Sequence, residues 1–180
     1  VIHDTGNTSK GAGADNHYRY FNGGNRNASA HYFVDDKEII QTVEDTNASW
    51  HCGDGKGKYG ITNQNSIGIE ICVNSDGNYE KAVAKTVELV NHLMKKHNIP
   101  IDRVVRHYDA SRKICPRSMS ANNWDKWNEF KKSLNEKSEP ANQTLYRVMA
   151  GSFANRANAE RQVNKLKAGG FDAVIMIFNK

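Results

Sequence analysis

The side chains with the most evident chemistry lie in the segment RHYDASRKICP, residues 106–116. It brings an imidazole (His107), an ammonium (Lys113) and a thiol (Cys115) into one short stretch, and a further histidine, His3, lies near the start of the chain. Two histidines and a cysteine are a natural ligand set for Zn²⁺, and three protein ligands leave a fourth position for water. If these three residues meet in the fold, the sequence predicts a metal-dependent hydrolase.

Two charged residues could assist such a metal. Lys113 precedes Cys115 by two positions, so an extended backbone would direct both side chains to one side, where the ammonium could stabilise an oxyanion. The alternative is a solvated surface lysine. Glu70 lies within IGIEICV, where a carboxylate is costly to bury without a partner. It either faces solvent or faces the metal-bound water and accepts its proton as a general base.

Short strands and helices must position these residues. Apolar runs end at His3 and lead into His107, so we expect both histidines at strand ends, on one edge of a sheet. The pattern predicts a mixed α/β fold, with a central sheet flanked by helices. The expected strands are 1–3, 31–34, 39–43 (a hairpin with 31–34), 67–73 and 104–105, and the expected helices are 14–21, a segment from an Asn78 cap to His97, and 124–134.

The C-terminal part has a different organisation. Residues 136–143 are polar, contain a proline and are predicted to link a first domain, 1–135, to a small unit, 144–180. That unit is expected to be β-α-β, with strands at 145–153 and 173–178 around a helix at 158–168. The alternative is a C-terminal element that packs on the first domain.

Composition limits the classes of function. The chain has 180 residues, 38% of them hydrophobic, a formal charge of +5 and a pI of about 9.1. The basic excess favours an anionic partner, either nucleic acid or anionic wall polymers, or else reflects an ordinary basic surface. Nucleic acid has little support, because the sequence contains neither an RNA-binding aromatic pattern nor a basic helix. No apolar run reaches the ~20 residues of a membrane span.

The start of the chain and its cysteines give two further expectations. No signal peptide is visible, and the abrupt beginning in a strand predicts that residues precede Val1 in the natural protein. Three cysteines are an odd number, which argues against a disulfide framework and for a reduced compartment, a metal ligand or both. Cys52 and Cys72 lack the spacing of a structural zinc site and are expected to pack in the core.

Five segments carry a family resemblance. In chain order they are VIHDT, SAHYFVD, ASWHCG, IGIEICV and VVRHYDASRKICP. Residues 1 to about 134 thereby resemble the zinc-dependent N-acetylmuramoyl-L-alanine amidases of the type-2 amidase family, which includes phage endolysins, autolysins and peptidoglycan-recognition proteins. The resemblance implies Zn²⁺ held by His3, His107 and Cys115, with Glu70 as the base and Lys113 as the oxyanion partner. Part of the family has a tyrosine where Ala30 precedes His31, so no tyrosine role carries over.

The resemblance also implies a reaction and a place of action. The reaction is hydrolysis of the amide between N-acetylmuramic acid and L-alanine by zinc-activated water, in an endolysin or autolysin acting on the bacterial cell wall. His31 and His51 are expected either to line the cleft and contact the substrate or simply to pack, and Asp109 is expected to cap or tie the loop before Cys115. The competing class is a non-catalytic peptidoglycan-binding protein of the same fold, from which the retained Cys115 distinguishes this chain.

The tail carries a second resemblance. YRVMAGSFANRANAERQVNKLKAGGFDAVI is similar to one half of a SPOR domain, a peptidoglycan-binding module. Complete modules contain two such units, and one unit cannot cover its own apolar strand surface. The sequence therefore suggests a homodimer in which two tails complete the module.

Overall fold

Two compact units, Val1–Ala141 and Asn142–Lys180, make up the chain. The structure is a computed structural model, and it describes residues 1–136, 151–171, 173 and 175. Within these residues no helix has both the length and the apolar character needed to cross a lipid bilayer.

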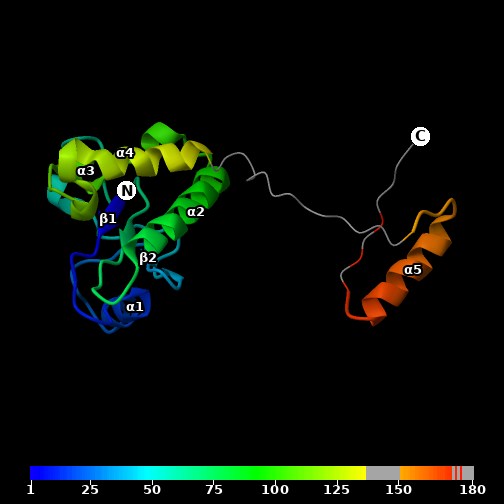
Figure 1. Cartoon of the computed structure of the whole chain (residues 1–180). Helices are drawn as coiled ribbons and strands as arrows, with labels where there is room; N and C mark the ends of the chain where they lie inside the picture. Colours follow the sequence, from blue (N-terminus) through cyan, green and yellow to red (C-terminus); the bar gives the residue numbers. More distant parts are fainter. Residues whose placement is uncertain (137–150, 172, 174, 176–180) are drawn as a thin grey trace. The chain divides into compact units, whose positions relative to one another are not determined.

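A four-stranded mixed sheet forms the centre of the first unit (Figure 1). Strand β4 runs parallel to both β1 and β2, whereas β2 and β3 form an antiparallel hairpin. The mixed α/β fold and the hairpin predicted from the sequence are therefore confirmed. The strands, in their order across the sheet, are β1 (Ile2–Asp4), β4 (Ile69–Ile71), β2 (Tyr32–Val34) and β3 (Ile39–Gln41).

Helices cover both faces of this sheet. Because side chains alternate along a strand, Tyr32 and Val34 enter the main core while Phe33 enters a second cluster with Ala14 and Cys72. Helix α2 (Tyr79–His97) packs on β4, β2 and α4 (Ala121–Glu136), and α1 (Ala14–Asn22) packs on the hairpin strands β2 and β3. Four short helical turns complete the first unit: η1 (Gly53–Gly55), η2 (Ile101–Arg103), α3 (His107–Ser111) and η3 (Arg117–Met119).

Helix α2 has the ends that its sequence predicts, and α4 buries the apolar stripe that its sequence predicts. The Asn78 side chain accepts a hydrogen bond from the Lys81 backbone N–H at the start of α2. At its other end, Asn98 adopts a left-handed conformation (φ 53°), which asparagine tolerates, two residues before a proline. In α4, the apolar stripe of Trp127, Phe130 and Leu134 is buried in the main core.

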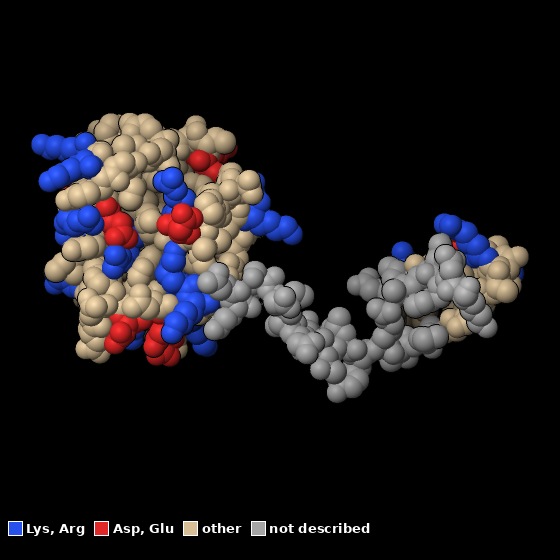
Figure 2. Space-filling view, turned by 90° about the horizontal axis from the view of Figure 1, so that it is seen from above, with Lys and Arg blue, Asp and Glu red and all other residues tan. Residues whose placement is uncertain are grey.

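The surface of the first unit carries charges of both signs. Figure 2 shows Lys and Arg side chains interspersed with Asp and Glu on the face turned to the viewer, rather than gathered into one basic band. This distribution supplies solubility and short-range ion pairs more than a long-range field.

Helix α5 (Arg156–Ala168) is the regular element described in the second unit. The Asn155 side chain caps it by accepting from the Ala157 N–H, and the helix agrees with the one predicted at 158–168. Its half-buried positions include Ala159, Val163 and Leu166, at helical spacing. The strands predicted at 145–153 and 173–178 fall largely outside the described residues and stay predictions.

Candidate metal centre

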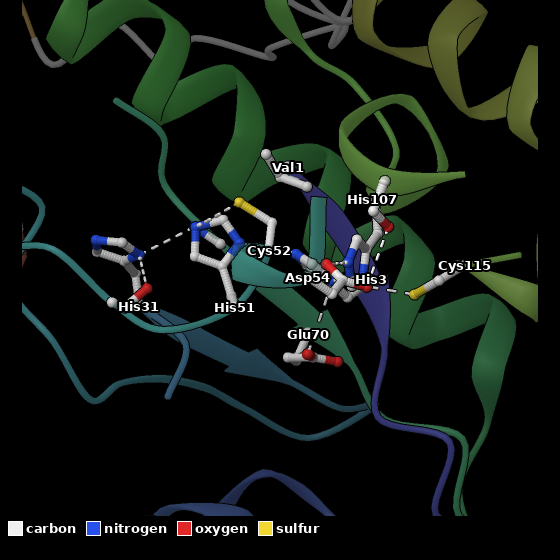
Figure 3. A network of polar contacts seen from close by, with 12 residues as sticks. Val1, His3, His31, His51, Cys52, Asp54, Glu70, His107 and Cys115 are labelled. Carbon is white, nitrogen blue, oxygen red and sulfur yellow. Dashed lines mark hydrogen bonds and ion pairs between the residues drawn. The ribbon is translucent and has the colours of Figure 1, made fainter. Parts of the chain in front are cut away.

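His3, His107 and Cys115 lie together in the first unit, all three buried (Figure 3). His3 Nδ1 is 3.0 Å from His107 Nδ1 and 3.9 Å from Cys115 Sγ, and one ligand atom from each residue lies within 4.8 Å of the others. A tetrahedral zinc site, with bonds of about 2.1 Å to nitrogen and 2.3 Å to sulfur, separates such atoms by about 3.3–3.6 Å. The observed distances bracket that range, so the three side chains fit one shared ion.

The local chain path explains how His107 and Cys115 reach His3. The backbone N–H of Ile2 donates to Val105 (2.9 Å), which lays this segment along β1. His107 then opens α3, and the Tyr108 N–H donates to the Cys115 carbonyl (3.0 Å), which brings the loop back. The sheet therefore supplies one ligand and the turn beside its edge supplies two.

Two sequence expectations need correction at this point. His107 does not end a strand: residues 104–105 form no named strand, and His107 is the first residue of α3. The cause is Asp109, whose carboxylate accepts from the Arg106 N–H (2.9 Å) and pairs with its guanidinium, starting a helical turn. The capping role expected for Asp109 is confirmed. His3, in turn, lies in the middle of β1 rather than at its end.

Glu70 is the side-by-side neighbour of His3 in the parallel pair of β1 and β4. Its Oε1 lies 3.9 Å from His3 Nδ1, and its Oε2 is buried without a hydrogen-bond partner among the described residues. Burial, reinforced by Asp4, raises the pKa of Glu70 to about 8, although Lys113 acts in the opposite direction. The carboxylate lies beside the three candidate metal ligands, and its buried Oε2 is the oxygen left available there.

His107 has a carboxylate behind it. Its Nε2 is 2.8 Å from Asp54 Oδ1, and Asp54 Oδ2 accepts from the Ser111 hydroxyl (3.1 Å). Burial alone would raise the pKa of Asp54, but the hydrogen bond and charge of His107 outweigh it and lower that pKa. Such a partner fixes the ring tautomer and leaves Nδ1 free for a metal.

Asp54 was missed in the sequence. It stands between two glycines in a loop, and the residue types alone do not identify its partner. The structure shows why a glycine follows Asp54: a Cβ added to Gly55 would lie 2.1 Å from the Ala110 carbonyl oxygen. Only glycine permits this close approach of η1 to α3, which is what carries Asp54 to His107.

The two histidines expected to line the cleft have different positions. His51 does border the cavities and its Nδ1 lies 3.0 Å from His3 Nε2. His31 is fully buried and borders neither cavity: its Nδ1 accepts from Gly68 N–H (2.9 Å) and Ser49 Oγ (2.7 Å), and its Nε2 contacts the Asn47 carbonyl (2.9 Å). Both ring nitrogens are used, so His31 holds the fold and is not available to a ligand.

Two adjoining cavities open onto the cluster, of about 700 and about 170 Å³. Trp50, His51, His107 and Lys113 border both of them, and Glu70 and Cys115 border the smaller. Trp50 is 70% exposed, so its large apolar ring is accessible in the wall of both cavities. Lys113 is exposed at the rim, and Lys56 adds a second ammonium to the larger cavity.

Burial keeps two of the ligand groups free of charge in the absence of a cation. It holds the pKa of His3 well below the ordinary value for histidine and raises the pKa of the Cys115 thiol to about 12. Binding of a metal ion by this set therefore displaces the thiol proton, while His3 is already in the neutral form that ligates.

Comparison with known proteins identifies this architecture. Residues 1–118 match the family model described as N-acetylmuramoyl-L-alanine amidase, and residues 126–177 match the SPOR domain model. The chain belongs to the N-acetylmuramoyl-L-alanine amidase family, which confirms the resemblance seen in the sequence. The first part of the SPOR match, from residue 126, falls on α4, which packs in the core of the first unit.

Individual relatives agree with this assignment. The chain is 41% identical to N-acetylmuramoyl-L-alanine amidase CwlH of Bacillus subtilis (strain 168), over 80% of this chain and 55% of the relative. It is 42% identical to amidase XlyA of the same organism, over 74% of this chain and 43% of the relative. The chain thus spans about half the length of these curated relatives.

Solved structures give the same result. The catalytic domain of XlyA superposes with a TM-score of 0.67 at 42% identity, over 74% of this chain and 82% of that one. The structure of PlyL superposes with a TM-score of 0.65 at 36% identity, over 74% of this chain and 80% of that one.

Proposed function

We propose that this chain hydrolyses the amide bond between N-acetylmuramic acid and L-alanine in peptidoglycan, using a zinc ion held by His3, His107 and Cys115. The observation that carries the proposal is the convergence of these three ligand atoms beside Glu70, whose Oε2 has no hydrogen-bond partner among the described residues, in the lining of the smaller cavity. Family membership and relatives described as N-acetylmuramoyl-L-alanine amidases support the choice of bond.

The donor set favours zinc. A thiolate and two neutral imidazoles suit Zn²⁺, whereas Mg²⁺ and Ca²⁺ prefer oxygen ligands. Three protein ligands leave a position open, as in catalytic rather than structural zinc sites. When bound, the ion would act as a Lewis acid and lower the pKa of a bound water molecule to about 7.

Glu70 is the general base in this proposal. A cation held by the neighbouring ligands would lower the pKa of Glu70 from the value of about 8 that burial gives it in the metal-free protein, so the carboxylate form is available. Its Oε2 then accepts a proton from the attacking water, and the same carboxyl group delivers that proton to the nitrogen of the leaving amine. The register of β1 and β4 holds Glu70 beside His3, so the base would be fixed next to any ion that His3 binds.

Lys113 offsets the negative charge that develops on the substrate carbonyl oxygen. Its side chain borders both cavities and acts electrostatically on His3, Glu70 and Cys115. A cation fixed near the reacting carbonyl stabilises the transition state more than the ground state.

The larger cavity is the proposed seat of the substrate. Its exposed Trp50 ring offers an apolar surface for a sugar or peptide, and the side chains of Asn63 and Gln64 add hydrogen-bonding groups. Lys56 provides positive charge for the carboxylates of a stem peptide.

The test is release of free amine from purified peptidoglycan. We expect activity that is lost on chelation and restored by zinc, and lost in Cys115→Ser together with the metal. Glu70→Gln should keep its zinc and lose at least about 10²-fold in turnover, whereas Glu80→Gln, at an exposed position in the first turn of α2, should match the wild type. Full activity after zinc removal, or a Glu70→Gln rate equal to that of the wild type, contradicts the proposal.

The tail, residues 144–180 after a linker at 136–143, is proposed to hold the 1–135 catalytic domain on the cell wall. The SPOR match supports this function, and Phe153, Phe171 and Ile175 are exposed apolar side chains within it. Because a single β-α-β unit leaves such surface uncovered, we further propose that two chains pair through their tails.

Two measurements test the anchoring role of the tail and the pairing of two tails separately. The Glu70→Gln chain should cosediment with insoluble peptidoglycan, and the same chain ended at residue 141 should bind less. Sedimentation velocity of the full chain should give a dimer. A monomer with a folded tail removes the pairing, and equal wall binding by both chains removes the anchoring role.

A further inference from the structure

A chain of hydrogen bonds leads away from His3 on the side opposite the metal cluster (Figure 3). His3 Nε2 is 3.0 Å from His51 Nδ1, His51 Nε2 is 3.2 Å from Ser66 Oγ, and Ser66 Oγ is 2.6 Å from the Thr62 carbonyl oxygen. This series of hydrogen bonds thus runs from a candidate metal ligand through a second imidazole and a hydroxyl to a backbone carbonyl.

The direction of every donor follows from the last link. A carbonyl oxygen only accepts, so the Ser66 hydroxyl donates to Thr62 and its lone pairs accept from His51 Nε2–H. A neutral His51 with its proton on Nε2 has a bare Nδ1, which accepts from His3 Nε2–H. His3 then presents an unprotonated Nδ1 to His107 and Cys115, which is the tautomer that can bind a metal ion.

We propose that His51 is a positioning residue that fixes the orientation and tautomer of the metal ligand His3, with Ser66 fixing His51 in turn. This role replaces substrate binding, the one expected of His51 from the sequence. The inference rests on the metal site of the proposed function, and it concerns metal binding rather than the identity of the bond cleaved.

The position of the His51 ring is determined on several sides. A Cβ added to Gly68 would lie 2.5 Å from His51 Cγ, so the ring rests directly on the Gly68 backbone. The backbone N–H groups of His51 and Cys52 both donate to Asn63 Oδ1 (3.1 and 2.9 Å). The ring also meets His3 edge-on, with planes at 90°. These contacts hold the ring where its Nδ1 can accept from His3, as the outer partner of a metal ligand must.

The two histidine ligands have different partners behind them. Asp54, a carboxylate, lies against His107, whereas a neutral imidazole lies against His3. Glu70 already places a carboxylate beside His3. A neutral acceptor therefore orients His3 without adding a further negative charge next to the proposed base.

The test measures zinc affinity, with the metal alone as the probe, by competition against a chelating dye. His51→Phe keeps a planar ring but removes the acceptor, and should weaken zinc binding about 10–100-fold. His51→Asn, which returns an acceptor near the position of Nδ1, should recover part of that loss, and Ser66→Ala should show a smaller loss. The matched control is His92→Phe, at an exposed position of α2, with wild-type affinity expected.

A second measurement avoids any variant. Histidine-labelled NMR of the metal-free protein should give His3 and His51 as Nε2–H tautomers. Unchanged zinc affinity in His51→Phe together with a raised KM would assign His51 to the substrate and overturn the inference, as would the opposite tautomer of His51. If His51→Phe loses zinc affinity but the wild-type protein cleaves no peptidoglycan, the inference stands and the proposed reaction is rejected.

Discussion

Replacing Gly55 by alanine should damage the metal site without touching a ligand. The added Cβ would lie 2.1 Å from the Ala110 carbonyl oxygen, 2.9 Å from the Ala110 carbonyl carbon and 3.2 Å from Ser111 Cβ. These are mainly backbone atoms at the end of α3, so they cannot turn aside as a flexible side chain would. Turn η1 must therefore retreat from α3 by more than about 1 Å before ordinary van der Waals distances return.

The size of the effect follows from that displacement. The bond from His107 Nε2 to Asp54 Oδ1 is 2.8 Å long, and about 1 Å more takes it beyond hydrogen-bonding range. Loss of such an outer partner weakens metal binding about 10–100-fold. A displacement of about 1 Å in catalytic geometry reduces turnover by up to about 10²-fold. The apo protein should lose much less in stability than the site loses in affinity, since the glycine lies outside the main core.

The matched control lies on the other side of Asp54. A Cβ on Gly53 would lie 3.1 Å from Asn63 Nδ2 and 4.0 Å from Asn63 Cγ, so a shift of the Nδ2 end by a few tenths of an ångström is enough to accommodate it. The hydrogen bonds that Asn63 Oδ1 accepts from His51 and Cys52 can stay in place during such a shift. Zinc competition and amine release should therefore separate Gly55→Ala from Gly53→Ala, with thermal melting of the metal-free chains as the check on folding. Wild-type zinc affinity in Gly55→Ala, or equal losses in both variants, would refute the role given to the contact between η1 and α3.

Two further predictions concern stability. Burial alone would raise the pKa of Asp45, but hydrogen bonds from Lys96, Tyr32 and His97 hold it well below the usual value, so Asp45→Asn should cost about 1–3 kcal/mol of unfolding free energy at neutral pH. Because the folded pKa is depressed, the contribution of Asp45 is present above its unfolded pKa and is lost as the pH falls below about 4, so urea titrations of the two proteins should converge in acid; a constant difference would contradict this reasoning. Phe130→Ala, at a side chain 2% exposed and stacked on Trp127, should cost about 3–5 kcal/mol by urea unfolding, and a cost below about 1 kcal/mol would show that α4 is not part of the main core.

Regular elements with local signals could be predicted from the sequence. Asn78 marks the start of helix α2, and Asn98 with the following proline marks its end. The hairpin 31–43 has two apolar runs around a charged turn. Periodicity and capping are properties of neighbouring residues, so they can be read along the chain. The apolar pair at 104–105 predicts a strand that runs into His107, but these residues form no named strand, and the reciprocal bonding of Arg106 and Asp109 starts a helical turn at His107.

The ligand triad could be proposed from residue types, but the groups behind it could not. His3, His107 and Cys115 are rare side chains with a recognised chemistry, and the strand and loop patterns around them limit where they can meet. Asp54 and Ser66 are common residues in a loop rich in glycine and asparagine, and nothing in their spacing distinguishes them from solvated neighbours. Their roles arise from contacts across 53 and 15 positions of the chain, which depend on the packing of loops rather than on periodicity.

His31 and His51 show why residue type alone leaves a function undecided. Both are histidines beside apolar or small residues, and both were expected near the cleft. The Gly68 backbone separates their roles, since its N–H donates to His31 Nδ1 while its α-carbon supports the His51 ring. A side chain at position 68 would push His51 away from His3, and a displaced backbone there would leave His31 Nδ1 with only one of its two donors, Ser49 Oγ. Gly68, directly before β4, therefore contacts both His31, which stabilises the fold, and His51, which orients the candidate metal ligand His3. This link predicts that Gly68→Ala weakens zinc binding in the same direction as His51→Phe.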